Sequence, residues 1–214
     1  QIREVTILPA HGGKAYKIEF CYSVPTQPQP LDPDQYLAID LGLNNFATVV
    51  DTATGAAVIL DGKRIKSINR WYNKENARLQ SIKDKQGLTG ITKRQARLLK
   101  KRDCRITEAM NRYVVWIANY ALQHRIGTVV LPRWDGIKDK IRHGRRGNQN
   151  FVQVPYHKFR QKLKSKCELY GIRFDDSHSE AYTSQVDALN LDPIAKPPYG
   201  RKRRIRRGLY RSAL

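Results

Sequence analysis

Three short apolar segments, at residues 36–40, 46–51 and 57–60, follow one another with only a few residues between them. Asn44-Asn45 and Thr54-Gly55 stand in the gaps, and these are residue types that tight turns favour. Strand-like segments so short and so closely spaced predict an antiparallel meander. Any fold of this chain must therefore accommodate a small sheet at this place.

Two helices are predicted after the meander. Residues 71–86 are polar and helix-favouring and are followed by Gly87. Thr92 is a suitable N-cap for a longer helix that reaches to about residue 125, and Gly127 is expected to end it. The longer helix carries one apolar stripe, made of Leu99, Ile106, Met110, Val114, Ile117 and Ala121. Together the two segments indicate a helical hairpin.

Two further short strands, at 128–131 and 172–174, flank a helix bounded by Pro155 and Gly171. The full order is strand-strand-strand-helix-strand-helix-strand. A meander followed by helix-connected strands predicts an α/β domain with a mixed sheet and flanking helices, and this order matches an RNase H-like fold.

The N-terminal part is predicted to be separate. Residues 3–24 alternate between apolar and polar side chains around His11-Gly12-Gly13, which predicts a β-hairpin with one buried face. Residues 25–35 contain repeated prolines and indicate a stiff linker. We therefore expect residues 1–24 to end a neighbouring domain and residues 36–214 to form the main one.

The charge of the chain points to nucleic acid. Among 214 residues, 40 Lys and Arg stand against 19 Asp and Glu, for a formal net charge of +21. Such a field attracts polyphosphates, and the basic residues are clustered. The three cysteines form no C-x-x-C pair, and no apolar run is long enough to span a membrane. These features predict an intracellular protein with no membrane partner; a cytoplasmic, nucleoid-associated location in a prokaryote is what the family resemblance described below implies.

Three basic clusters are the candidate nucleic-acid contacts; solvated charged faces are the alternative interpretation. The first lies on the long helix, the second lies in the loop after the strand at 128–131, and the third lies near the end of the sequence. Their members are Lys93, Arg94, Arg97, Lys100 and Lys101; Arg142, Arg145 and Arg146; and Arg203, Arg204, Arg206 and Arg207.

Asp40 is the main catalytic candidate. It stands at the end of the first apolar strand, where a lone carboxylate is costly to desolvate unless it binds a cation or receives hydrogen bonds. Two-metal phosphoryl transfer needs carboxylates gathered from several strand ends. A carboxylate that caps the turn before Gly42 is the alternative. Asp175 and Asp176 follow another strand, and we expect them only to solvate its end.

Several long blocks resemble one family. The segment IDLGLNNFATVV resembles the first nuclease motif of the TnpB/OrfB transposon-encoded proteins and of the related type V CRISPR effector nucleases. The resemblance continues in the family's order through residues 144–172, SEAYTSQ and KRRIRRGLYRS. It covers roughly residues 36–214, and it likens residues 1–24 to the end of the family's preceding wedge-type β-barrel domain. It implies a RuvC-like nuclease domain of an RNA-guided DNA endonuclease, with DNA and a guide RNA as partners.

By this resemblance Asp40 matches the first catalytic aspartate and is expected to bind Mg²⁺ or Mn²⁺. Many members carry a second carboxylate, a Glu, at the end of the strand that corresponds to 128–131, where this chain has Pro132. Glu180, before Tyr-Thr-Ser, is the expected replacement as both catalytic residue and metal ligand. Asp135 is the alternative.

Two family features are not found in this sequence. The third catalytic Asp follows the LYRS segment in the family, and the sequence stops at Leu214, so we expect a C-terminally incomplete domain. Residues 185–201 contain neither Cys nor His, so no zinc ribbon is expected there.

The leading hypothesis is a metal-dependent endonuclease domain. An RNA-guided DNA-binding protein with an inactive nuclease site is the alternative, and a basic RNA-binding protein of the ribosomal kind ranks last.

Overall fold

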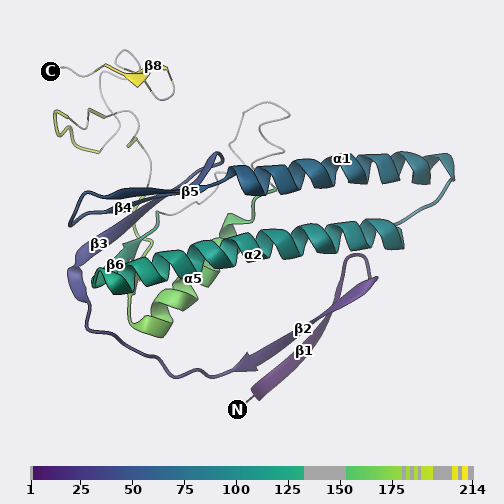
Figure 1. Ribbon diagram of the computed structural model, residues 1–214, viewed down its shortest axis with the longest axis horizontal. Coiled ribbons are helices and arrows are strands. Elements are labelled where there is room, and N and C mark those ends of the chain that lie inside the picture. The colour runs from purple at the N-terminus through teal and green to yellow at the C-terminus, as the bar shows by residue number, and fades with distance from the viewer. Residues whose placement is uncertain are drawn as a thin grey trace.

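A five-stranded mixed sheet forms the centre of the computed structural model, which describes residues 2–132, 153–179, 182–183, 186–187, 189–194, 204–206 and 209–211 (Figure 1). The strand order is β5-β4-β3-β6-β7. β3, β4 and β5 pair antiparallel, and β6 and β7 run parallel to β3. The bounds of these strands are β3 (Asp32–Leu41), β4 (Asn45–Asp51), β5 (Ala57–Asp61), β6 (Ile126–Val130) and β7 (Arg173–Asp175). The predicted meander and mixed sheet are thus confirmed.

Within the described residues, three helices accompany the sheet: α1 (Lys63–Lys85), α2 (Lys93–Gln123) and α5 (Tyr156–Tyr170). α1 and α2 lie side by side as a helical hairpin that extends well beyond the sheet, and α5 packs against α2 near the strands (Figure 1). The capping box at Thr92 and Gln95 starts α2 as expected. α1 begins earlier than predicted, because Ile65 and Ile68 bury one face of its first turns.

One face of the sheet carries the core. In β3, Leu37, Ile39 and Leu41 are buried, whereas the alternating residues face outward. Phe46 of β4 is fully covered and meets Phe159 of α5 edge to face, with ring centroids 4.8 Å apart. The buried residues of α2 complete this layer; they include Ile106, Met110, Val114, Ile117 and Ala121 of the predicted stripe. On the opposite face of β3, Asp40 is exposed.

Gly127 does not end α2, contrary to the prediction from the sequence. α2 ends at Gln123, before Gly127, and Gly127 lies within β6. A Cβ at residue 127 would lie 2.4 Å from the carbonyl oxygen of Asp32. The glycine is therefore needed for the close approach of β6 to β3, and the turn from α2 into β6 falls instead at Arg125, whose φ is 54°.

The N-terminal hairpin pairs β1 (Ile2–Ala10) with β2 (Ala15–Tyr22) around the expected turn. The prediction of a buried face is wrong for this chain, because the apolar face of the hairpin is exposed along its length; it includes Val5, Ile7, Tyr16, Ile18 and Phe20. The alternation identified the face, but nothing within the described residues packs against it. The proline-rich segment is attached to the main domain by a hydrogen bond, in which Gln27 N–H donates to the carbonyl of Leu169 at the end of α5.

The tip of the hairpin touches the helical hairpin. A Cβ at Gly12 would lie 2.3 Å from Cγ2 of Ile91, whereas a Cβ at Gly13 would meet nothing within 4 Å. Both glycines have positive φ, at 68° and 75°, so an alanine is strained at either position.

We therefore expect Gly12→Ala to loosen the contact between the two hairpins and Gly13→Ala to leave it intact. Hydrogen–deuterium exchange around Ile91 should rise in the first variant only. The added clash should cost about 1 kcal/mol more than the shared backbone strain. Equal exchange in the two variants would show that the hairpin tip does not pack against the α1–α2 turn.

No helix in the described part of the chain is both long enough and apolar enough to cross a lipid bilayer.

Two short strands, β8 (Arg204–Arg206) and β9 (Leu209–Tyr210), pair with each other apart from the main sheet.

Candidate functional site

Asp40 lies at the carboxyl end of β3, the central strand, on the face of the sheet opposite the core. Its neighbours Ile39 and Leu41 are buried, and Asp40 itself is exposed. Among the described residues no hydrogen bond or ion pair involves its carboxylate. Even so, the surrounding chain partly desolvates the charge, and this burial raises the pKa of Asp40 above its ordinary value. The strand therefore presents a carboxylate that no described residue neutralises.

The turn after Asp40 is tightly held. Gly42 N–H donates to the carbonyl of Phe46 at 3.1 Å. The hydroxyl of Tyr156, the first residue of α5, donates to the carbonyl of Gly42 at 2.7 Å. Nζ of Lys66 donates to Oδ1 of Asn44 at 2.6 Å. Groups from β4, α5 and α1 thus fix the backbone that follows the carboxylate.

Pro132 lies beside Asp40, at the same height in the sheet. Ala38 is paired with Val130, so the second residue beyond each, Asp40 and Pro132, lies at the same height. The carbonyl of Pro132 accepts a hydrogen bond from Nη1 of Arg160 at 3.0 Å. The strand next to β3 therefore supplies no carboxylate at this level.

Asp175 ends β7 and is in register with Val130 and Ala38, which places it on the same face as Asp40. Its carboxylate accepts the Ser177 hydroxyl at 2.7 Å and the Ser177 N–H at 2.9 Å. These two hydrogen bonds, with smaller contributions from His178 and Arg173, lower the pKa of Asp175. Its charge is thus already satisfied by its own turn.

Asp176 is also engaged, since its carboxylate pairs with Nη2 of Arg160 of α5 at 2.5 Å. The carboxylates of Asp175 and Asp176 therefore both have partners within the described residues. Within the described residues, no group of three or more His, Cys, Asp or Glu side chains is arranged to hold a metal ion. Asp40 suits a cation because it is anionic, partly desolvated and unpaired, but it needs further ligands.

Glu180, the expected second ligand, and the alternative Asp135 lie outside the described residues. So do Arg142, Arg145, Arg146, Arg203 and Arg207. Arg204 and Arg206 belong to β8, and their side chains are not described.

Cys167 is buried against the core, and burial, with a smaller effect of Glu168, raises the pKa of its thiol to about 12. Cys167 is therefore a packing residue.

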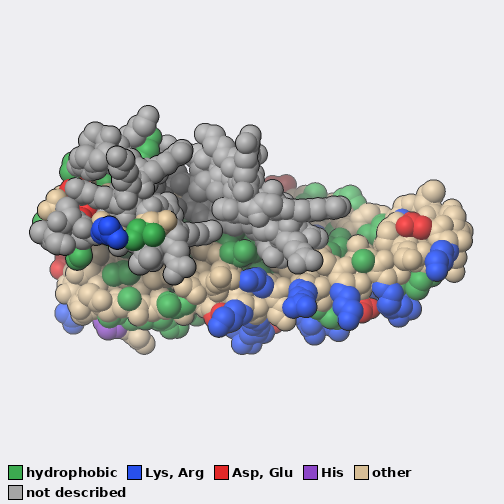
Figure 2. Space-filling view, turned by 90° about the horizontal axis from the view of Figure 1, so that it is seen from above, with side chains coloured by type: hydrophobic (Ala, Val, Ile, Leu, Met, Phe, Trp, Pro, Cys, Tyr) green, Lys and Arg blue, Asp and Glu red, His purple; other side chains and the backbone are tan. Residues whose placement is uncertain are grey.

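The first basic cluster is fully described and lies on one face of α2. Its five members are all exposed, at positions three and four residues apart that return to the same side of a helix: Lys93, Arg94, Arg97, Lys100 and Lys101. Figure 2 shows Lys and Arg side chains gathered along one long edge of the helical hairpin. We call these five residues, together with the exposed Arg105, the basic stripe.

Trp71 of α1 lies beneath part of the basic stripe. Nζ of Lys101 is 5.5 Å from the centre of its ring, and the guanidinium of Arg105 is 5.3 Å from it. This role of Trp71 was not predicted from the sequence, and neither were the exposed cations Arg70, Lys74 and Arg78 of α1. The spacing of those three cations, four residues apart along a helix, was the signal that could have identified them.

These features define an α/β domain with a carboxylate at the end of its central strand and a basic helical hairpin beside it. A family model described as a probable transposase, OrfB_IS605, matches residues 19–134. The match spans more than half of the sequence, and the chain therefore belongs to the OrfB_IS605 family. The resemblance to TnpB/OrfB proteins is confirmed.

Related proteins are larger than this chain. It is 24% identical over 189 residues to the CRISPR-associated endodeoxyribonuclease Cas12f1 of Syntrophomonas palmitatica, a match that covers 85% of this chain and 37% of that protein. The cryo-EM structure of a Cas12f1–sgRNA–target DNA complex matches with a TM-score of 0.60 at 17% identity, over 80% of this chain and 34% of the other. That of a CRISPR–Cas12f ternary complex matches with a TM-score of 0.57 at 17% identity, over 79% and 33%. The chain thus spans about a third of these relatives, and the structural matches establish the fold alone.

Proposed function

We propose that this chain is the RuvC-like, RNase H-like nuclease domain of a transposon-associated, RNA-guided DNA endonuclease. The observation that carries the proposal is Asp40, an unpaired carboxylate at the end of the central strand of a β5-β4-β3-β6-β7 sheet. Membership of the OrfB_IS605 family and the similarity to Cas12f1 support it. The β1–β2 hairpin, with its uncovered apolar face, is consistent with the end of a preceding wedge-type barrel.

Asp40 and Glu180 are the residues that would hold Mg²⁺ or Mn²⁺ in this proposal. A bound divalent ion would supply positive charge to the phosphodiester oxygens and help to ionise the attacking water. The chain's own contribution is to aim Asp40. The fixed turn at Gly42 holds the strand end, and the partial desolvation of Asp40 strengthens its attraction for a cation.

The basic stripe would bind the sugar–phosphate backbone of the nucleic acid, a guide RNA paired with its DNA target or a single strand. Its cations lie along about four turns of one helix, and two of them are held over Trp71. A row of fixed cations neutralises successive phosphates and releases their counterions. Binding that weakens steeply with added salt is the behaviour this arrangement supports.

A metal titration tests the proposed ligand set. Mn²⁺ at millimolar concentration is expected to raise the Tm of the wild-type chain by a few degrees, since an ion that binds only the folded state stabilises it. Asp40→Asn should remove most of this rise, and Asp34→Asn, at the other end of β3, should keep it. An equal rise in all three proteins would remove Asp40 from the metal site.

Two observations favour the alternative of a nucleic-acid-binding protein without cleavage. Pro132 stands level with Asp40, where many TnpB/OrfB proteins have a Glu. The carboxylates of Asp175 and Asp176 already have partners, in the Ser177 hydroxyl and in Arg160. In that case nucleic-acid binding would be unchanged, but Mn²⁺ would not raise the Tm. The same titration therefore separates the two functions.

A further inference from the structure

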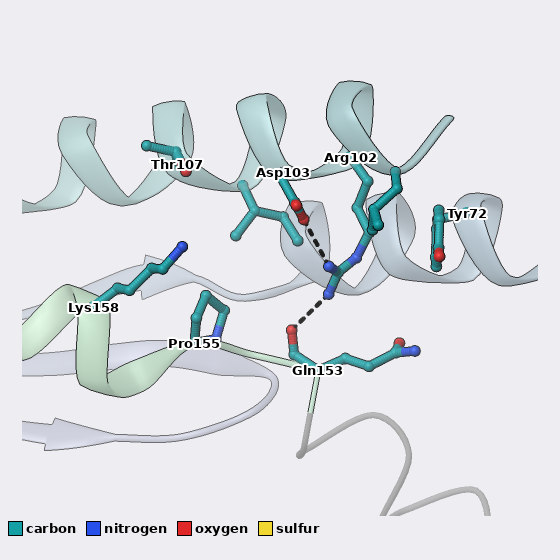
Figure 3. A pocket seen from close by; sticks show the side chains of 9 residues that line it. Tyr72, Arg102, Asp103, Thr107, Gln153, Pro155 and Lys158 are labelled. Carbon is teal, nitrogen blue, oxygen red and sulfur yellow. Dashed lines mark hydrogen bonds and ion pairs between the residues drawn. The ribbon is translucent and has the colours of Figure 1, made fainter. Parts of the chain in front are cut away.

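A half-open cavity of about 380 Å³ lies where α1, α2 and the start of α5 meet, away from the Asp40 strand end (Figure 3). Its volume is within the range of pockets that hold small organic groups. Part of its wall is apolar, from Leu99 and Ile106 of α2 and from Pro155. The rest carries polar side chains that the proposed chemistry at Asp40 does not use.

Arg102 forms a rigid wall of the cavity. Its Nε donates to Oδ1 of Asn69 at 2.8 Å, its Nη1 to Asp103 at 2.9 Å and its Nη2 to the carbonyl of Gln153 at 3.0 Å. The guanidinium also lies over the ring of Tyr72, 5.3 Å from its centre. Every nitrogen of Arg102 therefore has a partner within the chain. Its function here is to hold the Asp103 carboxylate in place.

The remaining polar groups face one another across the cavity. Asp103 and Thr107 are four residues apart on α2 and thus share one side of the helix. Lys158 reaches from α5 toward Thr107 (Figure 3). The side chains of Thr107 and Lys158 make no hydrogen bond or ion pair with any described residue. The Asp103 side chain keeps 42% of its surface exposed. The Asp103 end of the cavity accepts hydrogen bonds, and the Lys158 end donates them.

We propose that this cavity binds an unpaired guanine base of the bound nucleic acid. Guanine is the base whose Watson–Crick edge presents two adjacent donors, N1–H and the 2-amino group, followed by the acceptor O6. The two donors match the Asp103 carboxylate, and O6 matches the Thr107 hydroxyl and the Lys158 ammonium. The flat apolar wall at Pro155 suits the face of the ring. Proteins read single-stranded nucleic acid through such splayed bases.

The position of the cavity supports this ligand. Lys100 of the basic stripe and Thr107 of the cavity are seven residues apart and therefore lie on the same side of α2, two turns from each other. A strand whose phosphate contacts Lys100 can reach the cavity with a neighbouring base. The inference rests on the proposed binding of nucleic acid, and it adds a base-reading site to a surface that otherwise recognises the backbone.

The test measures the affinity of the chain for fluorescein-labelled thymidine oligomers of about 12 nucleotides, by fluorescence anisotropy. Each carries one central guanine, adenine or inosine. The guanine oligomer is expected to bind about tenfold more tightly than the adenine oligomer, as for one good bidentate contact. The inosine oligomer, which lacks the 2-amino group, should bind with intermediate affinity.

Two variants should remove the preference for guanine and leave the affinity for the adenine oligomer unchanged. Asp103→Asn replaces one of the two carboxylate oxygens with an NH2 donor, so the side chain can no longer accept from both guanine donors. Thr107→Val removes the hydroxyl but leaves the pair of Asp103 with Arg102 intact, so its result does not depend on that pair. A guanine preference that persists in both variants would place base reading elsewhere.

Lys158→Met tests whether Lys158 contacts the base or a phosphate. Lys164→Met, on the same helix, is its matched control. Loss of the guanine preference in Lys158→Met alone supports the proposal. Equal weakening for all three oligomers would identify Lys158 as a phosphate contact and overturn the base site. Tight binding by the wild-type chain with no base preference overturns the inference and leaves the proposed function standing. Failure to bind any oligomer overturns the proposed function itself.

Discussion

Asp40→Asn is expected to reduce cleavage of guide-matched DNA by the protein assembled with its guide RNA by at least about 10³-fold in Mg²⁺. The substitution keeps the shape of the side chain and removes the charge that would hold the cation. Because Asp40 has no partner among the described residues, the variant disrupts no hydrogen bond within that part of the chain. Binding of guide RNA and target DNA should remain within about twofold of wild type, measured by gel shift.

Asp34→Asn is the matched control, since Asp34 is an exposed aspartate near the opposite end of the same strand. It should cleave at the wild-type rate. Glu180→Gln is expected to match the loss in Asp40→Asn, and Asp135→Asn should have no effect. Wild-type cleavage by Asp40→Asn would refute the assignment of the nuclease site. Wild-type cleavage by Glu180→Gln with loss in Asp135→Asn would instead exchange the second ligand.

The pKa of Asp40 also gives the site a pH dependence. Burial raises this pKa in the folded chain, so the carboxylate takes up a proton at a higher pH than an unperturbed aspartate does. Metal binding should therefore weaken on acidification before ordinary surface aspartates titrate. In the absence of metal, the same raised pKa makes ionised Asp40 slightly destabilising above that pKa. Asp40→Asn should accordingly show a Tm at neutral pH that is equal to or slightly above wild type, an advantage that disappears as the pH falls toward 3.8.

Elements built from local interactions were predictable from the sequence. The meander follows from alternation and turn residues within about 25 positions, and the start of α2 follows from the pairing of Thr92 with Gln95. Asp40 could be singled out for the same reason, because it is a carboxylate at the end of a clearly apolar strand. Each of these features depends on neighbours close in sequence.

Features that depend on distant contacts were not predictable. The alternation in the hairpin identified its apolar face but could not tell whether this chain covers it. Gly127 looked like a helix terminator, and only the approach of Asp32 from β3 shows its role within β6. The pairing of Trp71 with Lys101 and Arg105 joins two helices across a turn. In each case the partner lies in another element and leaves no local pattern.

The support of Asp40 is the clearest example of a distant contact. Tyr156 and Gly42 are 114 positions apart, and their hydrogen bond joins the first residue of α5 to the turn that follows the candidate catalytic strand. Nothing in the sequence around Tyr156 suggests a role at the site. The structure shows that the hydroxyl of this buried residue, 4% exposed, is directed at the backbone two residues after Asp40.

Tyr156→Phe is therefore expected to affect the site through the position of Asp40. Loss of the hydroxyl leaves the Gly42 carbonyl without its donor and should cost about 1–2 kcal/mol of stability. A displaced strand end should raise the Mg²⁺ concentration for half-maximal cleavage several-fold and slow cleavage about tenfold at limiting metal. High Mg²⁺ should restore much of the rate, as expected for a positioning residue.

Tyr113→Phe separates this effect from general loss of packing. Tyr113 also stacks on Phe46, with ring centroids 5.0 Å apart, compared with 5.7 Å for Tyr156. Its hydroxyl also donates to a backbone carbonyl, that of Asp61, at 2.6 Å, but this carbonyl ends β5 and not the strand of Asp40. Tyr113→Phe should thus lower stability by a comparable amount and leave the Mg²⁺ requirement unchanged. If both variants shift the Mg²⁺ requirement equally, the hydroxyl of Tyr156 supports the fold in general, and the position of Asp40 does not depend on it specifically.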